Sequence, residues 1–134
     1  MNPFDLTDPL PRGTTVLEAS AGTGKTYAIA ALTARYLAEG RATIGDLLLV
    51  TFSRAATAEL RGRVRERIKD AAGMLRAAAD GVPARTDDPV DRALLGDGSD
   101  AAERAARLED AFRNFDAATI MTTHEFCHGM IHGL

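Results

Sequence analysis

A glycine-rich segment near the start of the chain constrains the fold more than any other feature. Residues Glu18–Thr26 read Glu-Ala-Ser-Ala-Gly-Thr-Gly-Lys-Thr and lie between a short apolar run, Thr15–Leu17, and a run with helical spacing that begins at Tyr27. A strand, a glycine loop and a helix in this order form the context in which such a loop binds phosphate. Gly22 and Gly24 allow a positive φ, so successive N–H groups can point at phosphate oxygens. We therefore predict that this turn binds a nucleotide.

The helix that follows the loop strengthens the attraction for an anion, because its first amides are unpaired and its dipole is positive at that end. Lys25 would reach the β and γ phosphates as a point charge, and the Thr26 hydroxyl would ligate Mg²⁺. These two residues are the predicted catalytic residues, and ATP and Mg²⁺ are the predicted cofactors. The predicted nucleotide contacts are Ala19, Ser20, Ala21, Gly22, Thr23, Gly24, Lys25, Thr26 and Tyr27. The alternative is an ordinary glycine-rich turn, since Ala19 replaces the first glycine of the strict motif.

The composition is that of a globular protein, because 46% of the 134 residues are hydrophobic and 26% are charged. This length suffices for one domain with a core of its own. No apolar stretch reaches the length of a membrane span, and the N-terminus lacks the pattern of a signal peptide. Cys127 is the only cysteine, so an intrachain disulfide is excluded. We expect a soluble, cytoplasmic protein.

Charge is segregated along the chain, although the formal net charge is only −3. The segment Asp80–Asp110 is mainly acidic, whereas the segment Arg54–Lys69 is mainly basic. This asymmetry predicts one basic face that could meet phosphates and one acidic surface that would repel them. The basic side chains fall on different faces of a helix, so we expect roughly half of them to serve solubility or subunit contacts. They are Arg54, Arg61, Arg63, Arg65, Arg67 and Lys69.

Alternating strand and helix patterns predict an α/β domain with a mostly parallel sheet. The run of leucines before Val50 is typical of a parallel strand covered on both faces. Asp100 and Glu103 have the spacing of a helix capping box. The predicted elements are an extended arm over residues 1–13, helices over Lys25–Glu39, Ala55–Ala79 and 100–114, strands over Asp46–Phe52 and Ala117–Thr122, a surface loop over Gly81–Gly98, and a short C-terminal helix.

Three segments taken together resemble the first motor domain of the UvrD-like superfamily 1 helicases, and most closely the helicase–nuclease branch of that family. They are Thr14–Thr26, Val50–Arg65 with its paired alanines and Glu-Leu-Arg, and Thr122–Cys127. The resemblance covers nearly the whole chain and implies a P-loop NTPase (RecA-like) fold. In it, residues 14–80 form the phosphate loop and a second strand–helix unit, and residues 99–134 form a helix, a third strand and a short helix. Alanine at position 19 is usual in this family.

The resemblance also implies contacts to single-stranded DNA at the carboxyl edge of the sheet. A hydroxyl or a helix amide would meet a phosphate, and the Phe52 ring would stack on a base. A buried Phe52 is the alternative. Glu125 departs from the small residue common in the family, and its charge would repel a phosphate unless it pointed away. The implied DNA contacts are Thr51, Phe52, Ser53, Arg54, Thr122 and His124, with Phe126 packed beneath them.

The last segment has a second interpretation. His124, Cys127, His128 and His132 are spaced so that one helical face could present them to zinc. A structural zinc site usually joins separate elements, however, and the family motif already accounts for His124. We therefore favour DNA contact over a metal.

The acidic pair and the arginine that an ATPase needs are missing from the sequence. By resemblance they lie beyond Leu134, with the second motor domain and the nuclease domain, so we expect an incomplete sheet with open edges and little turnover by this chain alone. The resemblance implies 3′ to 5′ movement along one DNA strand in the repair of broken duplex DNA. It also implies that the intact protein assembles with two partner subunits. A small P-loop kinase and a non-catalytic regulatory or DNA-binding module are the alternatives.

Overall fold

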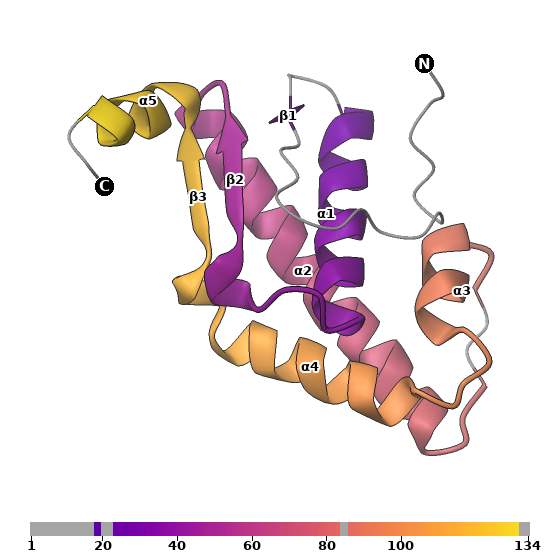
Figure 1. Cartoon of the computed structure of the whole chain (residues 1–134). Coiled ribbons are helices and arrows are strands. Elements are labelled where there is room, and N and C mark those ends of the chain that lie inside the picture. Colours follow the sequence, from indigo (N-terminus) through magenta and orange to yellow (C-terminus); the bar gives the residue numbers. More distant parts are fainter. Residues whose placement is uncertain (1–17, 20–22, 84–85, 132–134) are drawn as a thin grey trace.

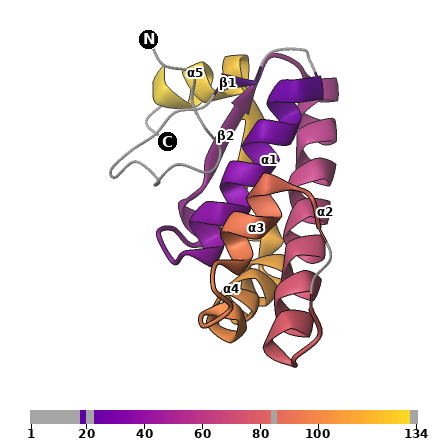
Figure 2. The same ribbon diagram turned by 90° about the vertical axis from the view of Figure 1, so that its right-hand side faces the viewer.

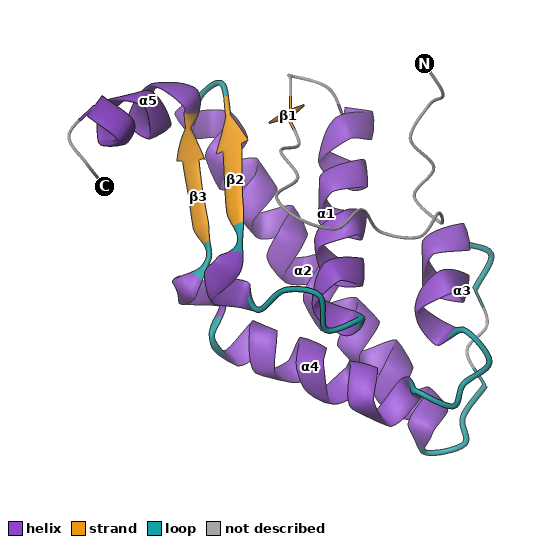
Figure 3. Ribbon diagram, viewed as in Figure 1, coloured by secondary structure: helices purple, strands orange, loops and turns teal. Residues whose placement is uncertain are grey.

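The computed structural model describes residues 18–19, 23–83 and 86–131. In this part of the chain three short strands form a parallel sheet in the order β1-β2-β3, and helices make up most of the remainder (Figures 1 and 3). The strands are β1 (Glu18–Ala19), β2 (Leu48–Thr51) and β3 (Thr119–Thr122). The predicted α/β class and parallel pairing are confirmed. The predicted arm over 1–13 and the strand residues Thr15–Leu17 lie outside the described residues.

The sheet has one covered face. Leu49 pairs with Ile120 and Thr51 with Thr122, and all of these side chains are buried. Leu48 on the opposite face is 46% exposed. Right-handed crossovers that step in one direction across a sheet place their helices on the same face. The expectation that β2 is covered on both faces is therefore wrong for the described residues.

Both longer strands are shorter than predicted, because a 3₁₀ turn precedes each of them. Ile44–Asp46 forms the turn before β2, where the Thr43 amide and hydroxyl donate to the Asp46 carboxylate at 3.0 and 2.8 Å. Phe115–Ala117 forms the turn before β3. The first contact between the two strands is the Thr119 amide, which donates to the Leu47 carbonyl at 3.2 Å.

Helices α1 (Thr23–Ala38) and α2 (Arg54–Ala79) follow β1 and β2 and run side by side (Figure 2). Most of α1 is buried around its circumference, as expected of a helix that is apolar on several sides. The predicted stripe on α2 is confirmed, since its side chains are all buried: Leu60, Val64, Ile68 and Leu75. No helix among the described residues is long and apolar enough to cross a membrane.

The predicted loop over Gly81–Gly98 contains a helix, α3 (Pro89–Leu95), so that prediction was wrong. Asp88 caps the helix by accepting from the Val90 amide at 2.8 Å, and Pro89 occupies the first turn. An aspartate followed by proline is a helix-start signal, because proline loses no hydrogen bond there. The buried side chains of Val90 and Leu94 then hold α3 against the rest of the protein.

Helix α4 (Ala101–Arg113) begins where predicted but without the predicted capping box. The side chain of Asp100 makes no cap hydrogen bond, because its ψ of 8° is far from the extended conformation in which a cap side chain reaches the helix amides. The helix ends before Asn114 and leads through β3 into α5 (Thr123–Ile131), the predicted C-terminal helix.

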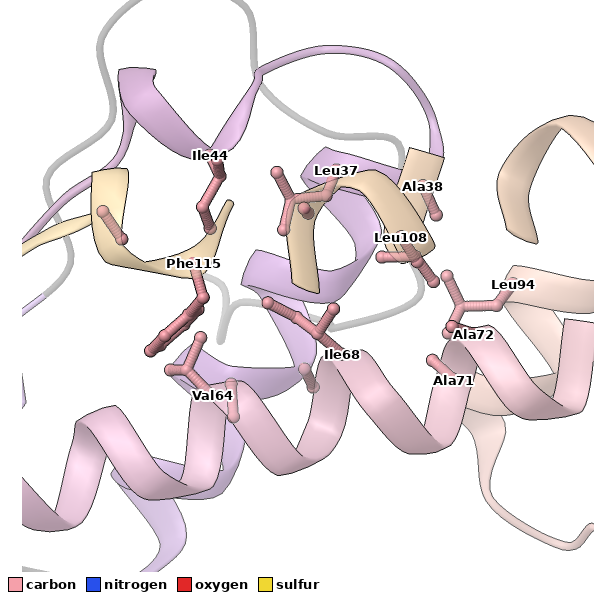
Figure 4. Close-up of a cluster of buried hydrophobic side chains, with 14 of the residues drawn as sticks. Leu37, Ala38, Ile44, Val64, Ile68, Ala71, Ala72, Leu94, Leu108 and Phe115 are labelled. Carbon is pink, nitrogen blue, oxygen red and sulfur yellow. The ribbon is translucent and has the colours of Figure 1, made fainter. Parts of the chain in front are cut away.

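The core lies where α2 crosses α4 beneath α1 (Figure 4). Arginines at the edge of this crossing also pack on aromatic rings. The Arg61 guanidinium lies 5.9 Å from the Phe115 ring centre and that of Arg65 lies 4.5 Å from the Phe112 ring centre. The core side chains labelled in Figure 4 are Leu37, Ala38, Ile44, Val64, Ile68, Ala71, Ala72, Leu94, Leu108 and Phe115.

A prediction concerns the end of α1, where Gly40 was expected to stop the helix. Its φ of +72° and the hydrogen bond from the Arg41 amide to the Tyr36 carbonyl at 3.0 Å form a Schellman turn. A Cβ at Gly40 would lie 3.0 Å from Cζ of Arg107, which donates to the Ala38 carbonyl. We expect Gly40→Ala to lower the free energy of unfolding by about 1–2 kcal/mol in urea denaturation.

The matched control is Gly73→Ala in the middle of α2. A Cβ at Gly73 would meet no atom within 4 Å, and its φ is not in the left-handed region. Alanine is the better helix former by about 0.5–1 kcal/mol, so this variant should be more stable than the wild type. Equal effects of the two substitutions would contradict the assignment of the Gly40 turn.

Candidate functional site

The register of the sheet brings the three sequence motifs to one edge. Ala19 at the end of β1 pairs with Thr51 at the end of β2, and Thr51 pairs with Thr122 at the end of β3. The strands are parallel, so the segment that follows each of them leaves from the same side. Ala19, residues 51–54 and residues 122–124 therefore lie side by side. The spacing of the motifs along the sequence does not by itself predict this row of Ala19, Thr51 and Thr122.

The structure describes part of the predicted nucleotide loop. Ala19 is the last residue of β1, where an extended backbone needs no glycine, and this explains why alanine is tolerated there. Helix α1 begins at Thr23, directly after the loop. Ser20, Ala21 and Gly22 lie outside the described residues, as does the side chain of Lys25. Thr26 is partly exposed and Tyr27 is 46% exposed.

The end of β2 is organised by hydroxyl groups. Thr51 is buried, and its hydroxyl lies 3.1 Å from the Ser53 carbonyl and 2.5 Å from Oγ1 of Thr57. Ser53 caps α2, because its Oγ accepts from the Ala56 amide at 3.1 Å. The hydroxyls of Thr51 and Ser53 thus shape the turn between β2 and α2. Phe52 projects from that turn.

Phe52 is 60% exposed, so the buried alternative for this ring is wrong. Arg54, two residues after Phe52, is also exposed and is the first residue of α2. An aromatic ring and a guanidinium that are both accessible at a strand end can reach a base and a phosphate, respectively. Ser53 between them is exposed as well, but its hydroxyl is engaged in capping α2, so Phe52 and Arg54 are the side chains at the end of β2 that are left for a ligand.

The end of β3 carries a capping box that the sequence analysis missed. The Glu125 amide donates to Oγ1 of Thr122 at 3.1 Å, and the Thr122 amide donates to Oε1 of Glu125 at 3.2 Å. Threonine followed three residues later by glutamate was the available signal. The carboxylate of Glu125 therefore turns back onto the helix start. Hydrogen bonds from the Thr122 amide and hydroxyl lower the pKa of Glu125 below its usual range.

A further hydroxyl joins the two strand ends. Thr123 donates from Oγ1 to the Thr51 carbonyl at 3.0 Å, so the starts of α2 and α5 are held next to each other. His124 is exposed and its ring stacks on His128, with 6.2 Å between ring centres. Thr122 itself is buried. The sequence analysis did not predict a role for Thr57 or Thr123. Thr57 meets Thr51 across the turn between β2 and α2, and Thr123 meets the end of the neighbouring strand.

The zinc alternative has no support among the residues that are described. No group of three histidine, cysteine, aspartate or glutamate side chains in that part of the chain could hold a metal ion. Cys127 is exposed and free, and His132 lies outside the described residues.

Several side chains of the basic segment bind other parts of the protein. Arg65 packs on the Phe112 ring of α4, Arg61 packs on the Phe115 ring of the turn before β3, and Nη2 of Arg67 lies 3.1 Å from Oδ1 of Asp91. Arg63 and Lys69 are exposed and form no ion pair with another described residue. The contacts of Arg61, Arg65 and Arg67 are made within the chain, so the expected division between phosphate binding and solubility or subunit contacts stays a prediction.

An open pocket of about 380 Å³ lies between α1 and α2. Thr26, Tyr27 and Ala30 line it from α1, and charged side chains line it from α2. The pocket thus begins at the residue predicted to ligate Mg²⁺ and extends along the helix pair. The lining side chains from α2 are Glu59, Arg63, Glu66, Arg67 and Asp70.

Comparison with known proteins agrees with this geometry. Residues 5–134 match the family model described as the UvrD/REP helicase N-terminal domain. The chain is 52% identical to the RecBCD enzyme subunit RecB of Mycobacterium tuberculosis (strain ATCC 25618 / H37Rv) over all of its length and 12% of the relative. It is 43% identical to the Escherichia coli (strain K12) subunit over 93% of its length and 11% of the relative.

The chain therefore belongs to the UvrD/REP helicase family. Within that family its relatives are RecB subunits, which confirms the resemblance to RecB, the beta subunit of exodeoxyribonuclease V, that the motifs predicted. The chain spans about one eighth of the length of the curated relatives it matches.

A prediction follows from the capping box. The lowered pKa of Glu125 means that its stabilising effect is present above its ordinary pKa of 4.5 and is lost as pH falls through the lower folded-state value. The melting temperature of the wild type should exceed that of Glu125→Ala at pH 7, and the difference should shrink on acidification. Glu125→Gln keeps the cap geometry without a titrating group, so its difference from Glu125→Ala should not change with pH. A pH-independent wild-type difference would contradict the capping role.

Proposed function

We propose that this chain is the ATP-binding part of a RecB-like ATP-dependent DNA helicase and exodeoxyribonuclease subunit. Residues 1–134 would form the N-terminal part of a RecA-like P-loop domain. The intact protein would act in double-strand break repair and recombination and would move 3′ to 5′ on single-stranded DNA. The observation that carries this proposal is the row formed by Ala19, Thr51 and Thr122.

The row supports coupling between ATP and DNA, because each strand end leads into a different binding segment. The nucleotide would bind after β1, and a DNA strand would cross the ends of β2 and β3. Because β1 and β2 are neighbouring strands and Ala19 pairs with Thr51, a change in the phosphate loop could reach Thr51 through one strand pairing. Energy from ATP can move a DNA strand only if the two sites are linked through structure that has two arrangements.

The residues at the start of α1 fit a magnesium nucleotide. The helix opens directly after the loop, no acidic residue lies in its first turn, and the Thr26 side chain is accessible. Main-chain amides of residues 19–24 and Lys25 would hold the phosphates, Thr26 would ligate Mg²⁺, and Tyr27 would complete the site. The bound metal would supply charge neutralisation at the phosphates.

DNA would lie against the exposed groups at the neighbouring strand ends. Phe52 would stack on a base, and Arg54 and His124 would meet the backbone phosphates. The turn that carries Phe52 is fixed by the buried hydroxyl of Thr51 and by the Ser53 cap. The Glu125 carboxylate binds the Thr122 amide, so it occupies Thr122 and leaves Arg54 and His124 as the proposed phosphate contacts.

The name of the relatives, RecBCD enzyme subunit RecB, supports further subunits as partners. We propose that RecC-like and RecD-like subunits bind the intact protein and that its substrate is a duplex DNA end, in the cytoplasm. The acidic magnesium ligands and the arginine of the ATPase would come from the rest of that protein. This chain alone would bind nucleotide weakly and turn it over slowly or not at all.

The first test of this function is Lys25→Ala. Loss of a charged hydrogen-bond partner of the phosphates should weaken Mg-ATP binding by about 10-fold or more in isothermal titration calorimetry. Lys69→Ala is the matched control, because Lys69 is an exposed lysine of α2 and should leave affinity unchanged. A kinase would show substrate-dependent phosphate transfer, and a regulatory module would hold DNA with the same affinity after Lys25→Ala. Equal nucleotide binding by both variants would refute the proposed role of Lys25.

The second test is Phe52→Ala, measured by fluorescence anisotropy with a labelled single-stranded oligonucleotide. Loss of one base-stacking ring should weaken binding by about 5-fold or more. Stability should change little, because the side chain is 60% exposed. Val82→Ala is the control, since Val82 is 57% exposed just beyond the opposite end of α2 and should not affect DNA binding.

A further inference from the structure

Four side chains tie the start of α1 to α2 and α3, and we call them the Tyr27 latch: Tyr27, Arg67, Asp88 and Asp91. Tyr27 directly follows Thr26 on α1, Arg67 lies on α2, Asp88 caps α3, and Asp91 lies in the first turn of α3. Contacts between α1 and α3 and between α2 and α3 bring these elements together (Figure 2). The latch joins residues that are far apart in the sequence, and none of the proposed nucleotide or DNA contacts accounts for its arginine or carboxylates.

The Asp88 carboxylate is the centre of the latch. Tyr27 donates from Oη to its Oδ2 at 2.7 Å, while its Oδ1 accepts from the Val90 amide at 2.8 Å. The Asp88 amide in turn donates to Oγ1 of Thr86 at 3.1 Å. The Asp88 carboxylate is therefore held in position by the start of its own helix. Because this acceptor is fixed, its hydrogen bond with Tyr27 also fixes the position of the Tyr27 side chain.

Arg67 completes the latch through charge. Its guanidinium lies 5.9 Å from the Tyr27 ring centre, and its Nη2 lies 3.1 Å from Asp91 and 3.5 Å from Asp88. Its side chain is only 17% exposed, so water screens these interactions less than at an open surface. Nε and Nη2 of Arg67 are buried and make no well-aligned hydrogen bond in the described part of the chain. The guanidinium is thus held by two carboxylates and a ring rather than by ideal hydrogen bonds.

The protonation of the latch agrees with this geometry. Burial and then the hydrogen bond and charge of Asp88 raise the pKa of the Tyr27 phenol, against the opposing charge of Arg67. Burial alone would raise the pKa of Asp88, but hydrogen bonds from Tyr27 and Val90 and the charge of Arg67 bring it below its usual range. Asp91 also favours the neutral phenol. At neutral pH the phenol donates and the carboxylate accepts.

We infer that Arg67 and Asp88 are positioning residues for nucleotide binding, which act by fixing Tyr27 and with it the first turn of α1. That turn carries Lys25 and Thr26, so its orientation sets where the phosphates and Mg²⁺ are held. The inference rests on the proposed nucleotide site. The pocket between α1 and α2 supports it, because Thr26, Tyr27 and Arg67 all line the same space. By linkage, bound nucleotide must in turn strengthen the attachment of α3.

The test measures the dissociation constant for Mg-ADP in this chain by calorimetry. Tyr27→Phe removes only the hydroxyl, and Asp88→Asn removes its acceptor while Oδ1 can still cap α3. Each substitution should weaken Mg-ADP binding by about 3- to 10-fold. The double variant should bind no more weakly than the weaker-binding single variant, because both substitutions remove the same contact. The control variants are Tyr36→Phe on the same helix and Asp87→Asn, whose partner is Arg92. They should bind like the wild type.

A second readout detects the latch without nucleotide. The chain has two tyrosines, so a Tyr36→Phe background leaves Tyr27 as the single phenol for absorbance titration. Its pKa should lie above 10.0 and should fall when Asp88→Asn is added, whereas Asp87→Asn should leave it in place. Circular dichroism at each pH identifies the range in which the chain stays folded.

The outcomes separate the two proposals. A wild-type chain that binds no Mg-ADP overturns the proposed function and this inference with it. Normal binding by the wild type together with unchanged affinity in Tyr27→Phe and Asp88→Asn overturns the inference alone, even if both variants melt at lower temperature. A Tyr27 phenol pKa that is at its ordinary value and does not change when Asp88→Asn is added also overturns the inference. Weaker binding with a shifted phenol pKa supports it.

Discussion

The hydrogen-bonded register of three parallel strands is the constraint on which the rest of this structure depends. It places Ala19, Thr51 and Thr122 in one row, and the helices that follow them begin beside one another. Because parallel strands need long crossovers, the chain between strand ends must form helices that cover the sheet. Those helices, α1 and α2, then carry Lys25 and Thr26 of the proposed nucleotide site and most of the basic residues, so one pairing pattern determines where both halves of the proposed site lie.

Arginines illustrate how the same residue type serves different ends in this fold. Arg65 packs on Phe112 of α4, Arg61 packs on Phe115 of the turn before β3, and Arg67 joins the Tyr27 latch. Arg54 remains exposed at the edge where DNA is proposed to bind. Each outcome follows from where α2 turns the side chain, since residues three or four apart share a face and intervening ones do not. A basic segment in a sequence is therefore weak evidence for a basic surface until the helix neighbours are known.

Local signals predicted some elements and misled at others. Gly40 predicted the end of α1, because its positive φ serves the turn whatever surrounds it. The Asp100–Glu103 spacing failed as a cap because Asp100 is not extended, while the same spacing at Thr122–Glu125 succeeded at the end of a paired strand. The strand fixes the extended backbone that a cap requires. The loop predicted over 81–98 missed α3 because its proline was interpreted as a breaker rather than as a helix start.

The sequence by itself determined the family, the α/β class, the helices α1, α2 and α4 and the three family motifs, since these depend on residue type and spacing along the chain. Only the tertiary structure decided that Phe52 is exposed, that one sheet face is open and that Tyr27 is tied to Asp88 and Arg67. These features arise between residues up to 61 positions apart. They depend on which surfaces come into contact when the chain folds, and no local sequence pattern predicts those contacts.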